Sequence, residues 1–180
     1  MPSETPVWQP NLSWITDDLA VGGRFPVERA AHLAEALGIG AAIDLRDEDR
    51  DDDAHLGRHG IAFLHLPTPD HGALTPAAIK AGIAFARRAA ADGRRLLVHC
   101  EHGIGRSATL ALCVMVDRGH DPLAALSLAK DRRAVVSPSP AQYAAWSAWL
   151  RDPAGAALPE HAIPDFDAFK AVAYRHLGAG

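Results

Sequence analysis

The sequence predicts an α/β fold: a central, mostly parallel, twisted sheet of about five strands with helices on both faces. Three short apolar segments, residues 41–45, 61–66 and 95–99, have the length and composition of buried strands. Helical patterns alternate with them, which is typical of parallel sheets because their strands need crossover connections. The 180 residues are enough for one domain with a sizeable core.

The start of the chain should form a hairpin and a helix. After a loose tail over residues 1–10, two apolar runs at 14–15 and 19–21 flank an Asp-Asp turn, which predicts a hairpin. The amphipathic pattern of residues 27–37 predicts a helix that ends at Gly38.

Residues 46–53 follow the strand at 41–45 and are almost all acidic residues and arginine. The ordinary interpretation of such a run is a solvated surface loop. The alternative is a rim that screens ligands, since ligands bind beyond the carboxyl ends of the strands in sheets of this kind. The sequence leaves both interpretations open.

The rest of the chain is predicted to be mainly helical. Thr75 and Pro76 suit the N-cap and the first position of a helix that runs to about residue 91. The segment 107–118 is apolar nearly all round and should be the buried central helix. Further helices are expected over residues 121–130, 140–150 and 165–176. We divide the chain into a tail (residues 1–10), one domain (residues 11–152) and a C-terminal extension with a short helix (residues 153–180).

Composition and charge narrow the function classes. The net charge of −4 offers no general attraction to nucleic acid or to an anionic membrane. No apolar run approaches the roughly 20 residues that span a bilayer, and no secretory signal pattern is visible. Two cysteines, Cys100 and Cys113, make no disulfide framework, and no Cys/His spacing fits a zinc site. We expect a cytoplasmic protein without a metal or cofactor, and the sequence indicates no oligomeric state.

The most informative segment is His-Cys-Glu-His-Gly-Ile-Gly-Arg-Ser, residues 99–107, between a predicted strand and a predicted helix. A strand, a tight loop and a helix N-terminus gather backbone N–H groups around an anion. These amides, the helix dipole and Arg106 all favour a thiolate at Cys100, which is the nucleophilic form of cysteine. We therefore expect Cys100 to attack the phosphorus of a bound phosphoryl group.

The neighbouring residues suit the same chemistry. Arg106 presents a planar fork of donors that matches two phosphoryl oxygens. Gly103 and Gly105 allow positive φ angles and a close approach of the backbone to a ligand. The Ser107 hydroxyl can donate to the sulfur and help the thiolate leave, whereas His99 is expected to support the loop backbone.

This segment resembles the signature loop of the cysteine-based protein tyrosine phosphatases. Over about residues 14–149, the chain resembles the compact, atypical type of their dual-specificity branch in particular. The resemblance implies a protein tyrosine phosphatase-like fold with phosphate held in the loop. The residues that it assigns to substrate binding are Glu101, His102, Gly103, Ile104, Gly105 and Arg106. A buried cysteine in a glycine-rich turn is the structural alternative, but it leaves Arg106 and Ser107 unexplained.

A second segment, residues 65–76, is rich in proline and glycine and resembles the general-acid loop of the dual-specificity branch. Asp70 is predicted to protonate the leaving oxygen and then to deprotonate the water that hydrolyses the cysteinyl-phosphate. His71 beside it could also carry a proton. An Asx turn is the structural alternative for Asp70.

Gln142 is the third candidate. In some families of this superfamily a glutamine after the signature helix orients the attacking water, and residues 135–142 resemble that loop. Ser139, Pro140 and Gln142 also have the pattern of a capping box at a helix N-terminus. Both roles are open.

The expected activity is phosphomonoester hydrolysis of phosphorylated proteins, without a metal, through a cysteinyl-phosphate. The only tyrosines, Tyr143 and Tyr174, follow the signature loop, so the loop tyrosine that deepens the pocket of tyrosine-specific relatives is missing. A shallow pocket would admit phosphoserine and phosphothreonine as well as phosphotyrosine. The alternative substrate is a small phosphorylated metabolite, such as an inositol or sugar phosphate, and the alternative function is a phosphate-binding adaptor without turnover. Cys113, on the central helix, is expected to be core packing.

Overall fold

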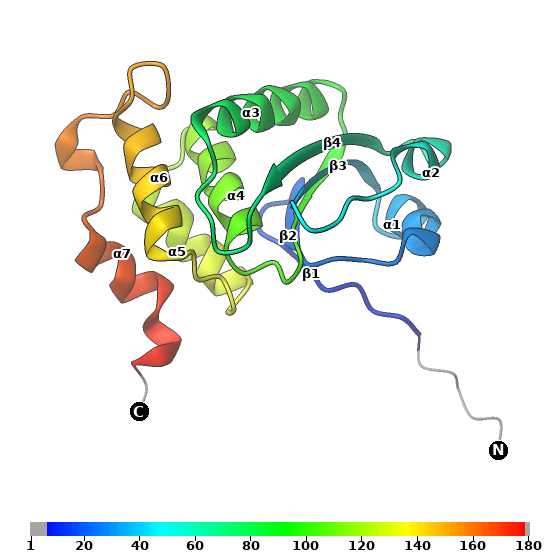
Figure 1. Cartoon of the computed structure of the whole chain (residues 1–180), viewed down its shortest axis with the longest axis horizontal. Helices are drawn as coiled ribbons and strands as arrows, with labels where there is room; N and C mark the ends of the chain where they lie inside the picture. The colour runs from blue at the N-terminus through cyan, green and yellow to red at the C-terminus, as the bar shows by residue number, and fades with distance from the viewer. Residues whose placement is uncertain (1–6, 179–180) are drawn as a thin grey trace.

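The computed structural model describes residues 7–178, and its centre is a five-stranded sheet in the order β1-β2-β5-β3-β4 (Figure 1). The strands are β1 (Leu12–Trp14), β2 (Leu19–Gly22), β3 (Ile39–Arg46), β4 (Ala62–Thr68) and β5 (Arg95–His99). β1 runs antiparallel to β2, and the other three pairs are parallel. The predicted α/β class is confirmed. Residues 1–6 of the expected tail lie outside the described residues.

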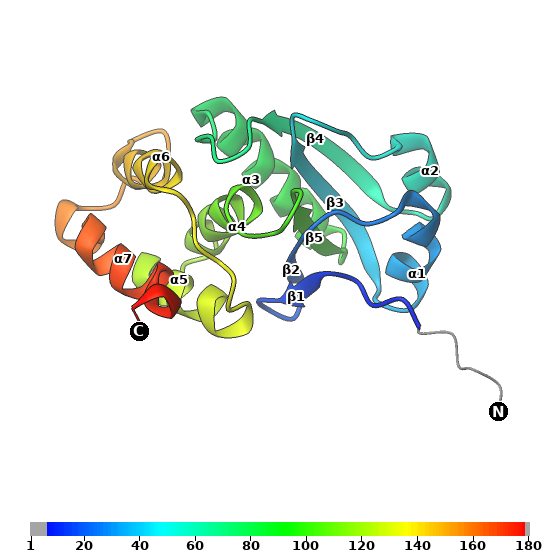
Figure 2. The same cartoon turned by 60° about the horizontal axis from the view of Figure 1, so that its bottom comes forward.

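Helices cover both faces of the sheet (Figure 2). One face carries α1 (Ala30–Glu35) and α2 (Asp53–Arg58), and the other carries α3 (Pro76–Ala91) and α4 (Arg106–Asp117). α5 (Pro122–Arg132) and α6 (Pro140–Arg151) pack against α4. A last helix, α7 (Phe166–Ala173), packs against α5. Three 3₁₀ turns complete the described chain, at Val27–Arg29, Glu160–Ala162 and Arg175–Leu177. None of these helices is long and apolar enough to cross a membrane.

The core is split by the sheet into two apolar clusters. The larger one joins β2, β3 and β5 to the helices α3–α7, with Val98, Leu112 and Trp146 among its members. The smaller one lies under α1 and α2 and includes Leu33 and Leu56. Every side chain of α4 from residue 106 to residue 116 is buried, so α4 is the central helix that its apolar pattern predicts.

Three elements differ from the prediction. The expected helix over residues 27–37 starts as a 3₁₀ turn, and α1 begins only at residue 30, because Arg29 (φ −91°, ψ 3°) leaves the helical region. β4 runs on through Pro67, which the sheet tolerates because β4 is an edge strand. α2 was not predicted. It begins inside the charged run, where the side chain of Asp52 accepts a hydrogen bond from the backbone N–H of His55.

The carboxyl ends of β3, β4 and β5 meet at one edge of the sheet. The strand register pairs Asp44 with His99, and Arg46 with Thr68. The segments that follow these strands, residues 47–53, 69–75 and 100–105, therefore start side by side. The polar residues singled out by the sequence lie in these segments, at the end of β5 and in the first turns of α4 and α6.

Candidate active site

The thiol of Cys100 lies between the end of β5 and the start of α4. The residue is 3 % exposed. Its sulfur accepts a hydrogen bond from the backbone N–H of Gly103 (3.3 Å) and lies 3.2 Å from the hydroxyl of Ser107. Gly103 has φ +70°, and a Cβ there would lie 2.5 Å from the backbone of Gly22. The loop can therefore close around the sulfur only with glycine at this position.

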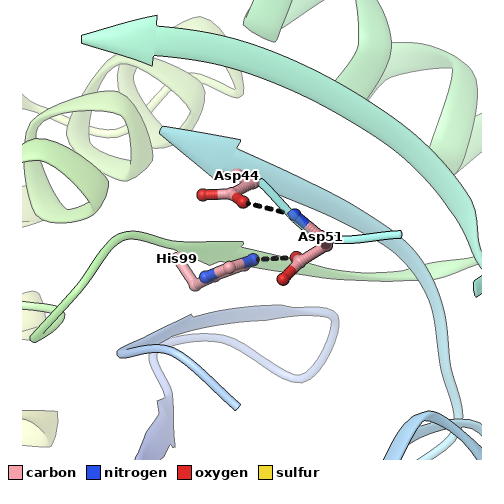
Figure 3. A group of neighbouring side chains, drawn as sticks. All are labelled: Asp44, Asp51 and His99. Atoms are coloured by element: carbon pink, nitrogen blue, oxygen red, sulfur yellow. Dashed lines mark hydrogen bonds and ion pairs between the residues drawn. The ribbon is translucent and has the colours of Figure 1, made fainter. Parts of the chain in front are cut away.

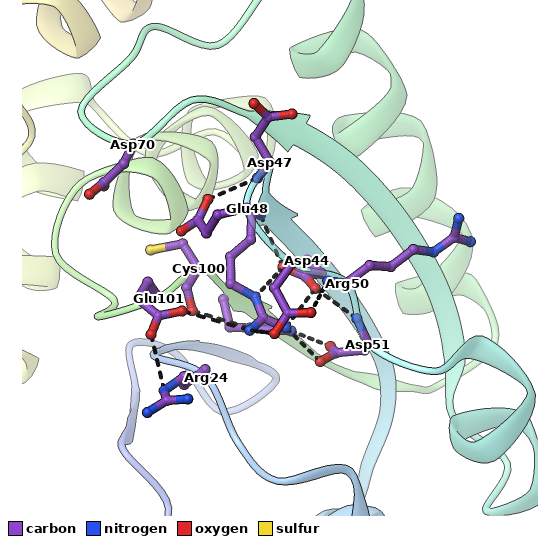
Figure 4. Close-up of polar contacts among 12 residues, drawn as sticks. Arg24, Asp44, Asp47, Glu48, Arg50, Asp51, Asp70, Cys100 and Glu101 are labelled. Atoms are coloured by element: carbon purple, nitrogen blue, oxygen red, sulfur yellow. Dashed lines mark hydrogen bonds and ion pairs between the residues drawn. The ribbon is translucent and has the colours of Figure 1, made fainter.

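Arg106 is the first residue of α4, and its guanidinium donates three hydrogen bonds to two partners. Both terminal nitrogens donate to the carboxylate of Glu48, at 2.7 and 2.8 Å, and Nη1 also donates to the carbonyl of Thr68 (2.8 Å). The hydrogen bond with Glu48 raises the pKa of Arg106. The same contact lowers the pKa of Glu48 to about 2, although 41 % of that side chain is exposed. The cation is thus fixed in place, and it lines the same cavity as Cys100. Figure 4 shows the Glu48 carboxylate together with the Cys100 thiol and the charged residues around them.

A second arginine supports the loop of residues 100–105, the predicted phosphate loop, on the side away from the sulfur. Arg133 donates to the backbone carbonyls of Gly103 (2.8 Å) and His102 (3.0 Å), and to the side chain of Asn11 (2.8 Å). Burial lowers the pKa of Arg133. Because these carbonyls point towards Arg133, the N–H groups of the same segment are free to face the sulfur.

Four charged or titratable side chains are buried together under the loop. Asp51 accepts from Arg46 Nη2 (2.9 Å) and from His99 Nε2 (2.5 Å), and Asp44 accepts from Arg46 Nε and Nη2 (3.0 Å each). Burial by itself would raise the pKa of Asp44, but the hydrogen bonds from Arg46 and the nearby His99 outweigh it and lower the pKa. His99 Nδ1 lies 3.4 Å from the carbonyl oxygen of Cys100, so this cluster supports the backbone of Cys100.

Asp44, Asp51 and His99 offer ligand atoms within 4.8 Å of one another, the spacing of a metal site (Figure 3). Arg46 Nη2 already donates to both carboxylates, at 2.9 and 3.0 Å. The guanidinium therefore supplies the positive charge that a cation would bring. These residues make a charge cluster rather than a metal centre.

Asp70 stands on the loop after β4, with its side chain 55 % exposed. Its carboxylate lies 3.3 Å from Arg106 Nη2 and accepts a hydrogen bond from the backbone N–H of His71 (3.0 Å). The carboxylate is therefore next to the cation that the sequence assigns to phosphate binding. The His71 side chain is more exposed, at 87 %, and its backbone has φ +58°.

Gln142 satisfies the capping box. Its side-chain oxygen accepts from the N–H of Ser139 (2.8 Å), and its own N–H donates to the Ser139 hydroxyl (3.2 Å). Its amide nitrogen donates to the carbonyl of Gly72 (3.2 Å), which lies in the predicted general-acid loop after β4, called the acid loop below. The side chain also packs against Gly105, where an added Cβ would lie 2.5 Å from its oxygen. Gln142 caps α6 and contacts both loops, and its water-orienting role stays a prediction.

A cavity of about 310 Å³ brings most of the predicted residues together. It is lined by Asp70, His71, Cys100, His102, Ile104, Gly105, Arg106, Ser137, Ser139 and Gln142. Glu101 is not among them: its carboxylate pairs with Arg24 (3.0 Å) and lies 3.7 Å from Arg46. Its side chain therefore turns away from the cavity, and only its backbone is available to the predicted phosphate loop.

The sequence interpretation missed Glu48, Asp51 and Arg133. The run of residues 46–53 is only in part the solvated loop first expected: residues 47–50, 52 and 53 are exposed, but Arg46 and Asp51 are buried and Glu48 reaches the site. The alternative, a rim at the carboxyl end of a strand, is closer to what the structure shows. The signal was there: a dense charge run directly after a buried strand. For Arg133 we find no comparable signal in the sequence.

The fold and the cysteine–arginine loop define a cysteine-based phosphatase. Residues 26–151 match the family model for the dual specificity phosphatase catalytic domain. This match covers most of the chain, and the protein belongs to that family. No curated protein sequence matches it.

Solved structures of this class share the fold. Tk-PTP in its active form has a TM-score of 0.69 and 21% identity, covering 77% of this chain and 95% of its own. PTPMT1 has a TM-score of 0.70 and 20% identity, covering 93% and 99%. Human DUSP28 has a TM-score of 0.64 and 24% identity, covering 80% and 95%. At these identities the likeness concerns the fold.

Proposed function

We propose that this protein hydrolyses phosphomonoesters of phosphorylated proteins through a cysteinyl-phosphate intermediate, without a metal ion. The observation that carries the proposal is one buried sulfur with three neighbours: the Gly103 N–H, the Ser107 hydroxyl and the Arg106 guanidinium at the floor of the same cavity. Each is a group that stabilises negative charge on sulfur or on a phosphoryl group.

In the first step, the Cys100 thiolate attacks phosphorus. The S–P bond forms as the P–O bond to the leaving group breaks, while Arg106 and the loop N–H groups bind the equatorial oxygens. Asp70 gives its proton to the leaving oxygen. The 3.3 Å contact between Asp70 and Arg106 supports this role, because the carboxylate lies next to the cation that would bind the phosphoryl group.

In the second step, a water molecule attacks phosphorus and Asp70 takes its proton. The S–P bond breaks and the electron pair returns to sulfur. The Ser107 hydroxyl, 3.2 Å away, donates to the departing thiolate. Phosphate then leaves, and the protonated Asp70 is ready for the next turnover.

The cavity favours a phosphorylated side chain over a polyanion. The Glu48 carboxylate stands beside Arg106 and repels further negative charge on a substrate. No lining residue is tyrosine, phenylalanine or tryptophan, which supports a pocket open to short phosphoserine and phosphothreonine side chains. PTPMT1 has been solved in complex with PI(5)P, so phosphoinositides belong in the substrate panel as the competing class.

The test is hydrolysis of an aryl phosphate with and without EDTA, and with vanadate. We expect activity that vanadate inhibits and EDTA leaves unchanged. Cys100→Ser should abolish turnover, whereas Cys113→Ala, which removes the other buried thiol, should retain it. Asp70→Ala should lower kcat by roughly 10²–10⁴ on a phosphoserine peptide. Turnover by the Cys100→Ser protein would refute the nucleophile, and an unchanged rate for Asp70→Ala would remove that residue from the mechanism.

A further inference from the structure

The C-terminal segment that follows α6 lies outside the residues matched by the family model, which end at residue 151. It returns along α5 and α6, so that α7 packs beside α5 (Figure 2). Phe169 anchors it: the residue is fully buried and its ring lies 4.8 Å from that of Tyr143 and 6.1 Å from that of Trp146. The segment is therefore part of the packed structure.

The end of this segment contacts the loop that precedes α6. Tyr174 donates its hydroxyl hydrogen to the backbone carbonyl of Pro138 (2.5 Å). Lys130, which is buried, donates to the carbonyl of Val136 (2.8 Å) and also pairs with Nδ1 of His176 (2.8 Å). Tyr174 directly, and His176 through Lys130 of α5, thus hold residues 136–139, which we call the rim segment.

The rim segment in turn contacts both halves of the active site. The Ser137 N–H donates to the carbonyl of Ile104 in the phosphate loop (2.9 Å). The Ser139 hydroxyl donates to the carbonyl of His71, next to Asp70 (3.0 Å). Ser137 and Ser139 also line the cavity. A shift of the rim segment would therefore be passed to the acid loop through Ser139.

We propose that Tyr174 is a positioning residue for the general-acid loop, acting through Pro138 and Ser139. The chain of contacts runs from the Tyr174 hydroxyl to the Pro138 carbonyl, and from the adjoining Ser139 to the His71 carbonyl. The loop is also held by Gln142 at the carbonyl of Gly72 and by Arg106 beside Asp70, but the Asp70 side chain is half exposed, so a remote hydroxyl can set where it stands. The activity part of this inference rests on the proposed function.

The chain offers a matched control. Tyr143 makes the same kind of bond, from its hydroxyl to the carbonyl of Pro164 (3.0 Å), but Pro164 belongs to the C-terminal segment and not to the rim. Tyr174→Phe and Tyr143→Phe each remove one hydroxyl from a Tyr–carbonyl bond between the C-terminal segment and the body. They differ in whether the carbonyl belongs to the rim segment.

The experiment compares the two variants on aryl phosphates with poor and good leaving groups. A misplaced acid slows only the reactions that need protonation, so Tyr174→Phe should lower kcat on phenyl phosphate by roughly 10- to 100-fold. On a substrate with a highly activated phenol it should change kcat much less, and Tyr143→Phe should change neither rate. An equal loss on both substrates, or equal behaviour of the two variants, would overturn the inference.

A second measurement does not depend on turnover. Amide exchange of Ser137, whose N–H donates to Ile104, should become faster in Tyr174→Phe and stay unchanged in Tyr143→Phe. If the wild-type protein hydrolysed no phosphomonoester, the proposed function would fail, and the exchange of Ser137 would still decide whether Tyr174 holds the rim segment. Unchanged exchange in Tyr174→Phe would overturn that contact's role.

Discussion

The buried charge cluster under the phosphate loop predicts that Asp51→Asn is strongly destabilising. Asp51 joins two buried partners, Arg46 and His99, and all three residues are less than a tenth exposed. The substitution keeps the size of the side chain and removes its charge. It leaves Arg46 and His99 in place with one fewer carboxylate between them.

The magnitude follows from the contacts. Asp51 accepts two charge-assisted hydrogen bonds, at 2.9 and 2.5 Å, and such bonds contribute about 1.5–3 kcal/mol each. An asparagine can keep one acceptor but turns an NH₂ group towards the other donor. We expect a loss of about 3 kcal/mol, the lower end of the range for breaking a buried pair. For a chain of this size that corresponds to a fall in Tm of about 6–12 °C.

Asp52→Asn is the control, because it makes the same substitution one residue away. Asp52 is exposed and caps α2 by accepting from the N–H of His55, and asparagine caps a helix equally well. Thermal denaturation of both variants should show a large fall for Asp51→Asn and a change within about 0.5 kcal/mol for Asp52→Asn. If the two variants unfolded at the same temperature, the pairing of Asp51 with Arg46 and His99 would not stabilise the fold as argued above.

Two further predictions concern the site itself. Since Arg106 holds the pKa of Glu48 at about 2 against an ordinary 4.5, the pair stabilises the fold fully above about pH 5 and loses this contribution as the pH falls towards 2. Glu48→Gln should lower the free energy of unfolding by about 1 kcal/mol at pH 7, a value kept small by solvent screening. Urea denaturation should show the difference between wild type and variant shrinking between about pH 5 and 3. A difference that stays constant with pH would contradict this account. Gly103→Ala should lower kcat/KM by at least roughly 100-fold, because the new Cβ meets backbone at 2.5 Å. Gly93→Ala is its control, with a similar φ of +66° but open space around it, and activity equal in the two proteins would refute the steric argument.

The phosphate loop could be predicted because its parts are contiguous. Strand, loop and helix N-terminus follow one another over residues 95–107, so spacing along the chain fixes their geometry. The central helix could be predicted for the same reason, since a segment apolar on all sides has to be buried. In both cases the conformation or burial that the local sequence pattern predicts is the one that these residues have in the folded protein.

The charge cluster could not be predicted, because it depends on distant partners. Asp51 pairs with His99, 48 residues later in the chain, and Glu48 is held by its bond to Arg106, 58 residues later. Locally, the run of residues 46–53 has the composition of a solvated loop. The strand register, which sets Asp44 opposite His99, brings these groups together, and that register is a property of the whole sheet.

The two halves of the site differ in how firmly they are held, and this difference decides which variants affect which step. Cys100, Ser107 and Arg106 are all buried and are fixed by the core and by the charges beneath the loop. Asp70 is half exposed, and its loop is held at the carbonyl of His71 by Ser139 of the rim segment and at the carbonyl of Gly72 by Gln142 of α6. Changes in the buried half should therefore lower stability and slow every substrate. Changes at the rim should leave stability nearly intact and slow only those substrates whose leaving group needs a proton.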